Sequence, residues 1–175
     1  METWFVDHFA DRETYHGFLS YVGAFSDAFS LVYFRYRPDE EPSQTVRQIS
    51  EALQPYLIYE QDVNRWPGTE TKNELGHIYR LHAYRRTMDS LKALEIADSL
   101  WDLDYPKFPM DLCFYRKGFA WFSSTVHERW NELCTDQPYV IADLKSIGLR
   151  LECTGKTDES KLYFDDRLTH LFDSV

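Results

Sequence analysis

The sequence predicts an α+β fold in which helices cover a mixed, mostly antiparallel sheet of about five strands. Two observations support this prediction. Runs with two-residue alternation are separated by segments whose apolar residues recur at helical spacing. The run 110–125 folds back at Lys117-Gly118, so at least one pair of strands is antiparallel. Because helices and strands alternate in the middle of the chain, a three-layer α/β arrangement stays open as the alternative.

Five segments have the composition of strands, since aromatic and β-branched residues alternate with polar ones along them. In order they are 31–37, 75–86, 110–117, 119–125 and 149–154. Pro38 ends the first, because proline cannot donate to a strand ladder. The third and fourth form a hairpin, because Gly118 accepts the positive φ of a tight turn.

Five further segments have helical apolar spacing. In order they are 11–22, 43–57, 88–101, 126–134 and 138–147, and 161–172 favours a terminal helix. The first three begin at side chains suited to capping: Asp11, Ser43 and Thr87. Thr125 and Glu128 have the spacing of a capping box, which predicts that the fourth helix follows the hairpin directly and buries Trp130.

A single domain is expected over residues 1–175, because the length is ordinary for one domain and no repeat, low-complexity run or linker divides the chain. Hydrophobic residues make up 43% of the chain and aromatic residues 17%. That composition argues against disorder and suits either a well-filled core or a protein-contact surface.

The formal net charge is −10. Phosphate backbones repel a chain of this charge, so nucleic acid is disfavoured as a partner. A basic protein is therefore the expected partner.

The three cysteines lack the spacing of a metal site or a disulfide framework, which indicates reduced thiols and a cytoplasmic location. The first residues lack the basic and apolar regions of a signal peptide, and no apolar run approaches the ~18–20 residues of a membrane span.

No phosphate loop, dinucleotide fingerprint or metalloprotease helix is present. No cofactor and no metal are therefore expected.

The predicted strands are basic although the chain is acidic. Arg80, Arg116 and Lys117 are candidate anion-binding residues, because their side chains suit phosphate or carboxylate groups. The excess of acids favours another interpretation, in which the strand arginines pair within the molecule with carboxylates of the helices.

The main interpretation assigns no catalytic residue. An alternative is a small hydrolase or a ligand sensor built around the same basic patch. In the hydrolase, His82 or His127 would serve as general acid or base, and Glu128 would orient a histidine.

Candidate partner-binding residues lie in two polar loops. Trp66 stands in a Pro-Gly loop, where it is either a pin folded onto the body, which we favour, or an exposed contact residue. Asp39, Glu40 and Glu41 form an acidic triplet, which is typical of a solvated loop and also suits a basic partner.

These observations favour a non-enzymatic binding protein that neutralises or scaffolds a basic partner. In being small, acidic and rich in aromatic residues, the chain resembles bacterial toxin-neutralising (immunity) proteins. The resemblance is one of composition and carries no residue role with it.

Overall fold

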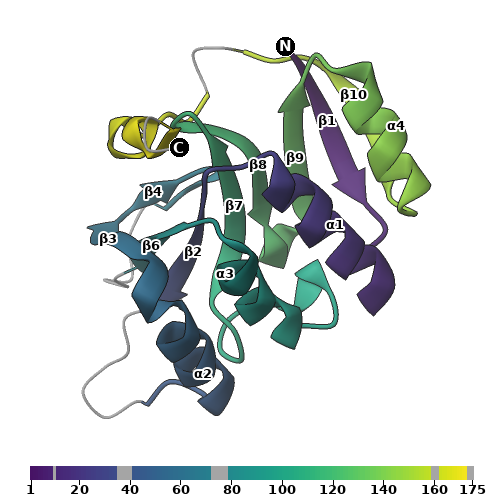
Figure 1. Cartoon of the computed structure of the whole chain (residues 1–175). Coiled ribbons are helices and arrows are strands. Elements are labelled where there is room, and N and C mark those ends of the chain that lie inside the picture. The colour runs from purple at the N-terminus through teal and green to yellow at the C-terminus, as the bar shows by residue number, and fades with distance from the viewer. Residues whose placement is uncertain (10, 35–40, 72–78, 159–161, 173–175) are drawn as a thin grey trace.

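The computed structural model describes residues 1–9, 11–34, 41–71, 79–158 and 162–172. Its centre is an eight-stranded sheet in the order β10-β1-β9-β8-β7-β2-β6-β3 (Figure 1). The strands are β1 (Glu2–Asp7), β2 (Ala28–Phe34), β3 (Leu57–Val63), β6 (Tyr79–Arg85), β7 (Met110–Arg116), β8 (Phe119–Thr125), β9 (Trp130–Thr135) and β10 (Arg150–Lys156). A separate hairpin is formed by β4 (Arg65–Trp66) and β5 (Thr69–Glu70).

The helices are short. The α-helices are α1 (Arg12–Ala24), α2 (Gln44–Leu53), α3 (Met88–Lys92) and α4 (Pro138–Ser146). The 3₁₀ turns are η1 (Gln54–Tyr56), η2 (Ala93–Ile96), η3 (Leu100–Asp102), η4 (Val126–Glu128) and η6 (Asp166–Phe172). No helix among the described residues is long and apolar enough to cross a membrane.

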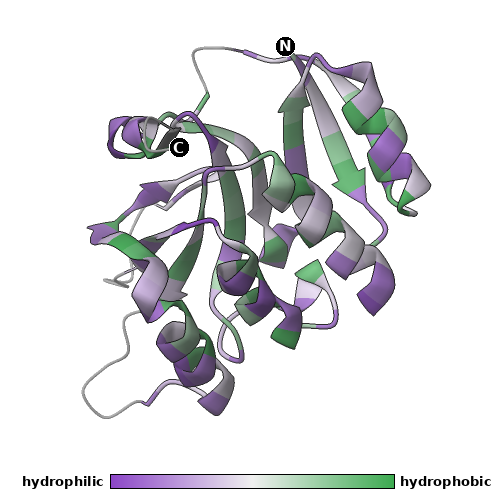
Figure 2. Ribbon diagram, viewed as in Figure 1, coloured by the Kyte–Doolittle hydropathy of each residue, from purple (hydrophilic) through white to green (hydrophobic). Residues whose placement is uncertain are grey.

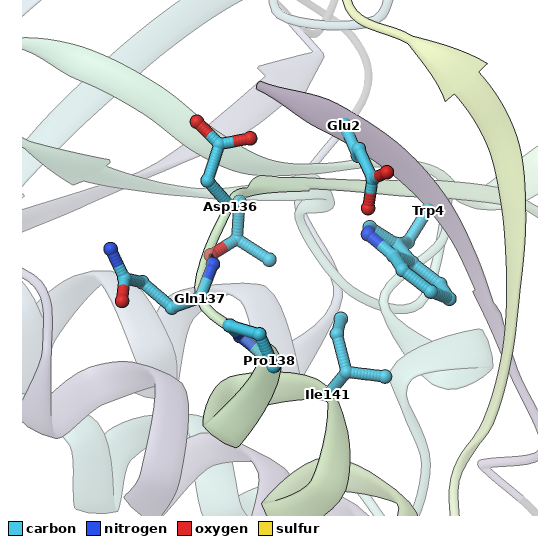
Figure 3. Close-up of a pocket in the computed structure, with 7 residues that line it drawn as sticks. Glu2, Trp4, Asp136, Gln137, Pro138 and Ile141 are labelled. Atoms are coloured by element: carbon cyan, nitrogen blue, oxygen red, sulfur yellow. Dashed lines mark hydrogen bonds between the residues drawn. The ribbon is translucent and has the colours of Figure 1, made fainter.

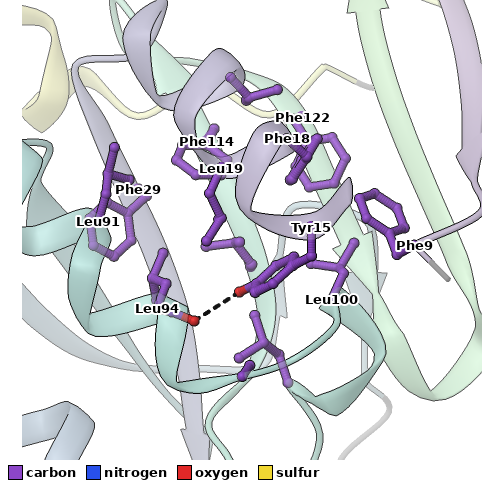
Figure 4. Packing of buried hydrophobic residues seen from close by; sticks show 14 of the residues in the cluster. Phe9, Tyr15, Phe18, Leu19, Phe29, Leu91, Leu94, Leu100, Phe114 and Phe122 are labelled. Carbon is purple, nitrogen blue, oxygen red and sulfur yellow. Dashed lines mark hydrogen bonds between the residues drawn. The ribbon is translucent and has the colours of Figure 1, made fainter. Parts of the chain in front are cut away.

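The larger core lies between one face of the sheet and the α-helices. Phe18 of α1 packs against Phe114 of β7 and Phe122 of β8, with ring centroids 6.3 and 4.8 Å away (Figure 4). Tyr15 is fully buried beside them, and its hydroxyl donates to the carbonyl of Leu94 at 3.1 Å. The helices carry hydrophobic and hydrophilic residues side by side, as expected of elements with one buried stripe (Figure 2).

A smaller core covers part of the opposite face. Apolar side chains of β2, β6 and β7 contribute to it, among them Val32, Leu81 and Cys113. Trp66 from the β4–β5 hairpin and Leu168 from η6 close over these side chains. The hairpin and the C-terminal turn therefore shield the central strands on the side that the α-helices leave open.

The predicted fold class is wrong in its sheet. The sheet has eight strands rather than about five, and every pairing in it is antiparallel rather than mixed. The three-layer α/β alternative is also wrong, because it requires parallel strands and the described residues form none.

The additional strands come from segments that were not predicted as strands. Residues 2–7 form β1, ahead of the helix predicted over 11–22, and residues 57–63 form β3, of which only Leu57 lies within the helix predicted over 43–57. Most of 126–134 belongs to η4 and β9: the Thr125 side chain makes no cap, and Arg129, with φ of 53°, turns the chain into a strand. The helix predicted over 88–101 is broken into α3, η2 and η3.

Candidate functional site

Several aromatic and acidic side chains of the sheet lie on one face of its outer strands. In β1 and β9 alternate residues point to opposite faces, so Val6 and Leu133 enter the core while their neighbours in sequence face away from the α-helices. The residues on the outward side are Phe5, Asp7, Trp130, Glu132 and Glu152, and we call them the outer-sheet face. The pairings Phe5↔Glu132 and Phe5↔Glu152 place three of them in one row across β9, β1 and β10.

Trp130 is the most exposed aromatic residue of this face, with 43% of its surface accessible. Its ring packs on Phe5 with centroids 4.8 Å apart, and its indole Nε1 donates to Glu132 Oε1 at 3.0 Å. These two contacts fix the orientation of the ring while leaving one side open. An aromatic side chain held in place in this way loses little conformational entropy when a partner binds.

The outer-sheet face is acidic. Asp7, Glu132 and Glu152 contribute three carboxylates, and the nearest strand cation is Arg150, whose Cα pairs with that of Asp7. A surface with more carboxylates than cations attracts basic groups and raises the rate at which they associate.

The β4–β5 hairpin forms one border of this face. Trp130 pairs with Thr125, whose hydroxyl donates to the carbonyl of Gly68 at 3.3 Å. The hairpin thus covers the sheet up to β8, whereas the smaller core that it closes includes no residue of β9, β1 or β10.

Trp66, a candidate contact residue, is buried with 3% of its surface exposed. Its indole donates to Asp111 Oδ2 at 2.8 Å, so it pins the hairpin to the body and is not available to a partner. Burial raises the pKa of Asp111 although Val126 N–H and Trp66 both donate to its carboxylate.

The acidic triplet lies mostly beyond the described residues. Asp39 and Glu40 are outside them, and Glu41 is exposed and paired with Arg47 at 2.8 Å.

Arg80 has carboxylate partners within the molecule. Its Nε lies 2.9 Å from Asp62 Oδ1, and its Nη1 lies 3.3 Å from Glu60 Oε1. Arg80 is thus paired within the molecule, but both acids belong to the neighbouring strand β3 and not to a helix as the pairing interpretation expected. One guanidinium against two carboxylates leaves an acidic cluster. Arg80 is therefore a poor anion-binding residue in this structure.

His82 and His127 are not brought together. His82 lies on β6 between Glu60, 3.4 Å from its Nε2, and the Tyr84 hydroxyl, 3.1 Å from its Nδ1. Burial lowers the pKa of His82. His127 follows β8, which is three strand spacings away, or about 14 Å at ~4.8 Å per spacing.

His127 has one charged neighbour among the candidate residues. Its Nε2 lies 3.8 Å from Glu128 Oε1, and both side chains are more than half exposed. A solvated pair of this kind lacks the enclosed environment that tunes a catalytic acid or base.

Arg116 and Lys117 lie at the β7–β8 turn. Lys117 has a φ of 50°, and its N–H donates to Asp27 Oδ2 at 2.6 Å. Arg116 lines a cavity of about 170 Å³ together with Phe119, Trp121 and other residues.

The described part of the chain contains no cluster of three metal-ligating side chains. The chain matches no protein-family model, and no curated protein and no solved structure is significantly similar to it.

Sequence reasoning missed Trp130 and Phe5 as surface residues. A usable signal was present, because Trp130, Glu132 and Cys134 alternate with Asn131, Leu133 and Thr135, and this two-residue period is typical of a strand.

Proposed function

We propose that this chain is a non-enzymatic binding protein that neutralises or scaffolds a basic protein partner, and that the outer-sheet face is its binding surface. The observation that carries this proposal is the exposed Trp130, held by Phe5 and Glu132 on a face that carries three carboxylates. Tryptophan residues in such positions supply much of the energy of protein interfaces. The acidic surroundings select a basic partner.

The size of the face limits what it contributes. Three strands at ~4.8 Å spacing and about six residues at ~3.3 Å rise give roughly 14 by 20 Å. That is the area of an interface centre rather than of a whole standard interface, which buries about 800 Å² on each partner. The interface with the partner therefore extends beyond the outer-sheet face. The neighbouring β4–β5 hairpin is the nearest surface for the polar rim of that interface.

A cytoplasmic location is part of this proposal. Its support is that Cys113, Cys134 and Cys153 are all free thiols, as expected in a reducing compartment.

Site-specific crosslinking tests the surface. A photoreactive phenylalanine analogue is placed at Trp130 or, as the matched control, at Tyr139, which is 49% exposed on α4. Lysate of the host is added at low salt, and crosslinked proteins are identified. We expect one basic protein to crosslink from position 130 and not from 139. Equal crosslinking from both positions, or none from 130, would refute the assignment.

The partner found in this way then provides a quantitative test. Trp130→Ala is expected to weaken its binding about 30-fold, the equivalent of ~2 kcal/mol for a central interface residue. Glu132→Lys is expected to slow association and to reduce its salt dependence. Tyr139→Ala and Glu51→Lys are the controls, since both positions are exposed on α-helices.

A second candidate function, the sensing of a small anionic ligand, rests on one observation. Arg116 lines a cavity with Phe119 and Trp121. Thermal-shift screening of phosphates and carboxylates tests this candidate. A ligand that stabilises the wild type and not Arg116→Gln would support it, and a screen without any stabilising anion would remove it.

A further inference from the structure

A second cavity lies on the opposite side of β1, between the start of this strand and the first turn of α4. Its volume is about 200 Å³. Six of its lining residues are labelled in Figure 3: Glu2, Trp4, Asp136, Gln137, Pro138 and Ile141. The volume exceeds the ~150 Å³ that holds a benzene molecule and is below the ~300–1,000 Å³ of drug-sized pockets. The cavity is therefore of the size of one amino-acid side chain or a comparably small molecule.

The cavity contains an unused hydrogen-bond donor. The indole Nε1 of Trp4 is buried and has no acceptor among the described residues. Leaving such a donor unpaired costs free energy, because the group has lost its water without gaining a partner. In Figure 3 the indole nitrogen lies directly below a carboxylate oxygen of Glu2. A ligand whose cation draws this carboxylate away, and whose acceptor takes its place beside the nitrogen, would satisfy the donor.

The rim of the cavity is acidic. Glu2 makes no ion pair with another described residue, whereas Asp136 Oδ1 lies 3.4 Å from the amine nitrogen of Met1. Glu2 is therefore the carboxylate open to a ligand cation. The nearest lysine, Lys145, places its ammonium 5.9 Å from the ring centroid of Trp4 and makes no ion pair with Glu2.

The rest of the lining is apolar. The Trp4 ring, Pro138 and Ile141 form a surface against which an aliphatic chain can pack. An aliphatic stem with a cation at one end and a carbonyl at the other matches these three features together. A lysine residue has this structure, with its ammonium for Glu2 and its backbone carbonyl for Trp4 Nε1.

We propose that this cavity is a binding site for a lysine-like cation, meaning an alkylammonium group joined to an amide or carboxylate carbonyl. The inference is independent of the proposed function, because the cavity and the outer-sheet face lie on opposite sides of β1. The same chemistry comes from two sources, a free amino acid or a lysine side chain of a polypeptide, and the experiment separates them.

The test follows the indole N–H signals of the protein by ¹H–¹⁵N NMR during titration. The chain has five tryptophans, and Trp4→Phe identifies the signal of Trp4. The probes are Nα-acetyl-lysine amide, free lysine, and Nα-acetyl-norleucine amide, which keeps the stem and the carbonyls but lacks the charge. We expect the lysine amide to shift the Trp4 signal selectively and the norleucine amide to bind at least tenfold more weakly.

Variants of the rim complete the test. Glu2→Gln keeps the shape of the exposed side chain and is expected to remove most of the preference for lysine amide over norleucine amide. Glu152→Gln, outside the cavity, is expected to leave that preference unchanged. Binding of free lysine as tight as that of the amide would indicate a small-molecule site, whereas binding of the amide alone would indicate a polypeptide side chain.

Two results would overturn the proposal. One is a Trp4 signal that no lysine probe shifts. The other is a shift that lysine amide and norleucine amide produce equally. If Glu2→Gln alone shifts the Trp4 signal and no probe does, then Glu2 itself accepts the indole hydrogen bond and the cavity has no cationic ligand.

Discussion

Replacing Trp66 with phenylalanine tests whether the buried carboxylate of Asp111 anchors the β4–β5 hairpin. The two side chains are 3% and 1% exposed, and the indole Nε1 lies 2.8 Å from Asp111 Oδ2. A hydrogen bond to a charged group contributes about 1.5–3 kcal/mol to stability. Trp66→Phe is therefore expected to lower the free energy of unfolding by ~1.5–3 kcal/mol through the loss of this hydrogen bond. The smaller ring buries less apolar area, which adds a smaller loss of stability.

Trp121→Phe is the matched control. Trp121 is also buried, at 4% exposure, and its indole donates to Ser26 Oγ at 2.9 Å. The acceptor is a neutral hydroxyl, so the expected loss from this bond is only about 0.5–1.5 kcal/mol. Urea unfolding of both variants at neutral pH measures the difference, which we expect to be about 1 kcal/mol.

The pH dependence identifies the charge as the cause. Burial raises the folded-state pKa of Asp111 above its ordinary value of 3.8, so the folded protein takes up this proton first as the pH falls. The indole hydrogen bond favours the charged form, and its removal raises the folded-state pKa further. The loss in Trp66→Phe is therefore largest above the folded-state pKa and shrinks as the pH falls through it. Equal losses in the two variants, or a loss in Trp66→Phe that does not change with pH, would refute this reasoning.

Three further predictions concern the remaining polar contacts and one turn. Asp165→Asn is expected to cost about 1–3 kcal/mol in urea unfolding, because Asp165 accepts hydrogen bonds from Arg167 and Tyr59. Burial raises the pKa of Asp165, but these hydrogen bonds outweigh the effect of burial and leave the pKa below 3.8. The unfolding free energies of wild type and variant should therefore converge as the pH falls through that lowered pKa. A difference in stability that persists in strong acid would contradict this. Gly118→Ala is expected to lower the free energy of unfolding by about 1–3 kcal/mol, because Gly118 has a φ of +78° and a Cβ there would lie 2.7 Å from the Asp165 carbonyl oxygen. An unchanged melting temperature would disprove this strain. Arg80→Ala is expected to change stability by less than about 1 kcal/mol, because its ion pairs are partly exposed, and a loss above ~2 kcal/mol would show that they are not ordinary surface pairs.

Features of the fold that depend on neighbouring residues were predictable from the sequence. Lys117 and Gly118 form the predicted turn with φ of 50° and 78°. Asp11, Ser43 and Thr87 each accept a hydrogen bond from a backbone N–H in the first turn of their helix, as a capping side chain does. In each case the stabilising contact lies within a few positions of the residue that signals it.

Strands that depend on distant partners were not predictable in the same way. In β1, Glu2 pairs with Thr135 and Trp4 with Leu133, so the contacts that make this segment a strand lie far away in sequence. In β3, the polar run Glu60-Gln61-Asp62 has no strand composition of its own. It occupies the edge of the sheet, where charged residues are favoured because they discourage pairing with another chain. Local composition could not predict the pairing of β1 or the edge position of β3.

The candidate site was missed for one identifiable reason. In a helix, Trp130, Leu133 and Cys134 share one face, since residues three and four positions apart are neighbours, and all three would be buried together. In a strand, Trp130, Glu132 and Cys134 share a face instead, and Leu133 points the other way into the core. The capping-box spacing of Thr125 and Glu128 favoured the helix, but the Thr125 hydroxyl bonds to Gly68 of the hairpin. Thr125 therefore does not cap a helix, and the pairing of this segment with β8 and β1 gives it a period of 2, which places Trp130 on the surface.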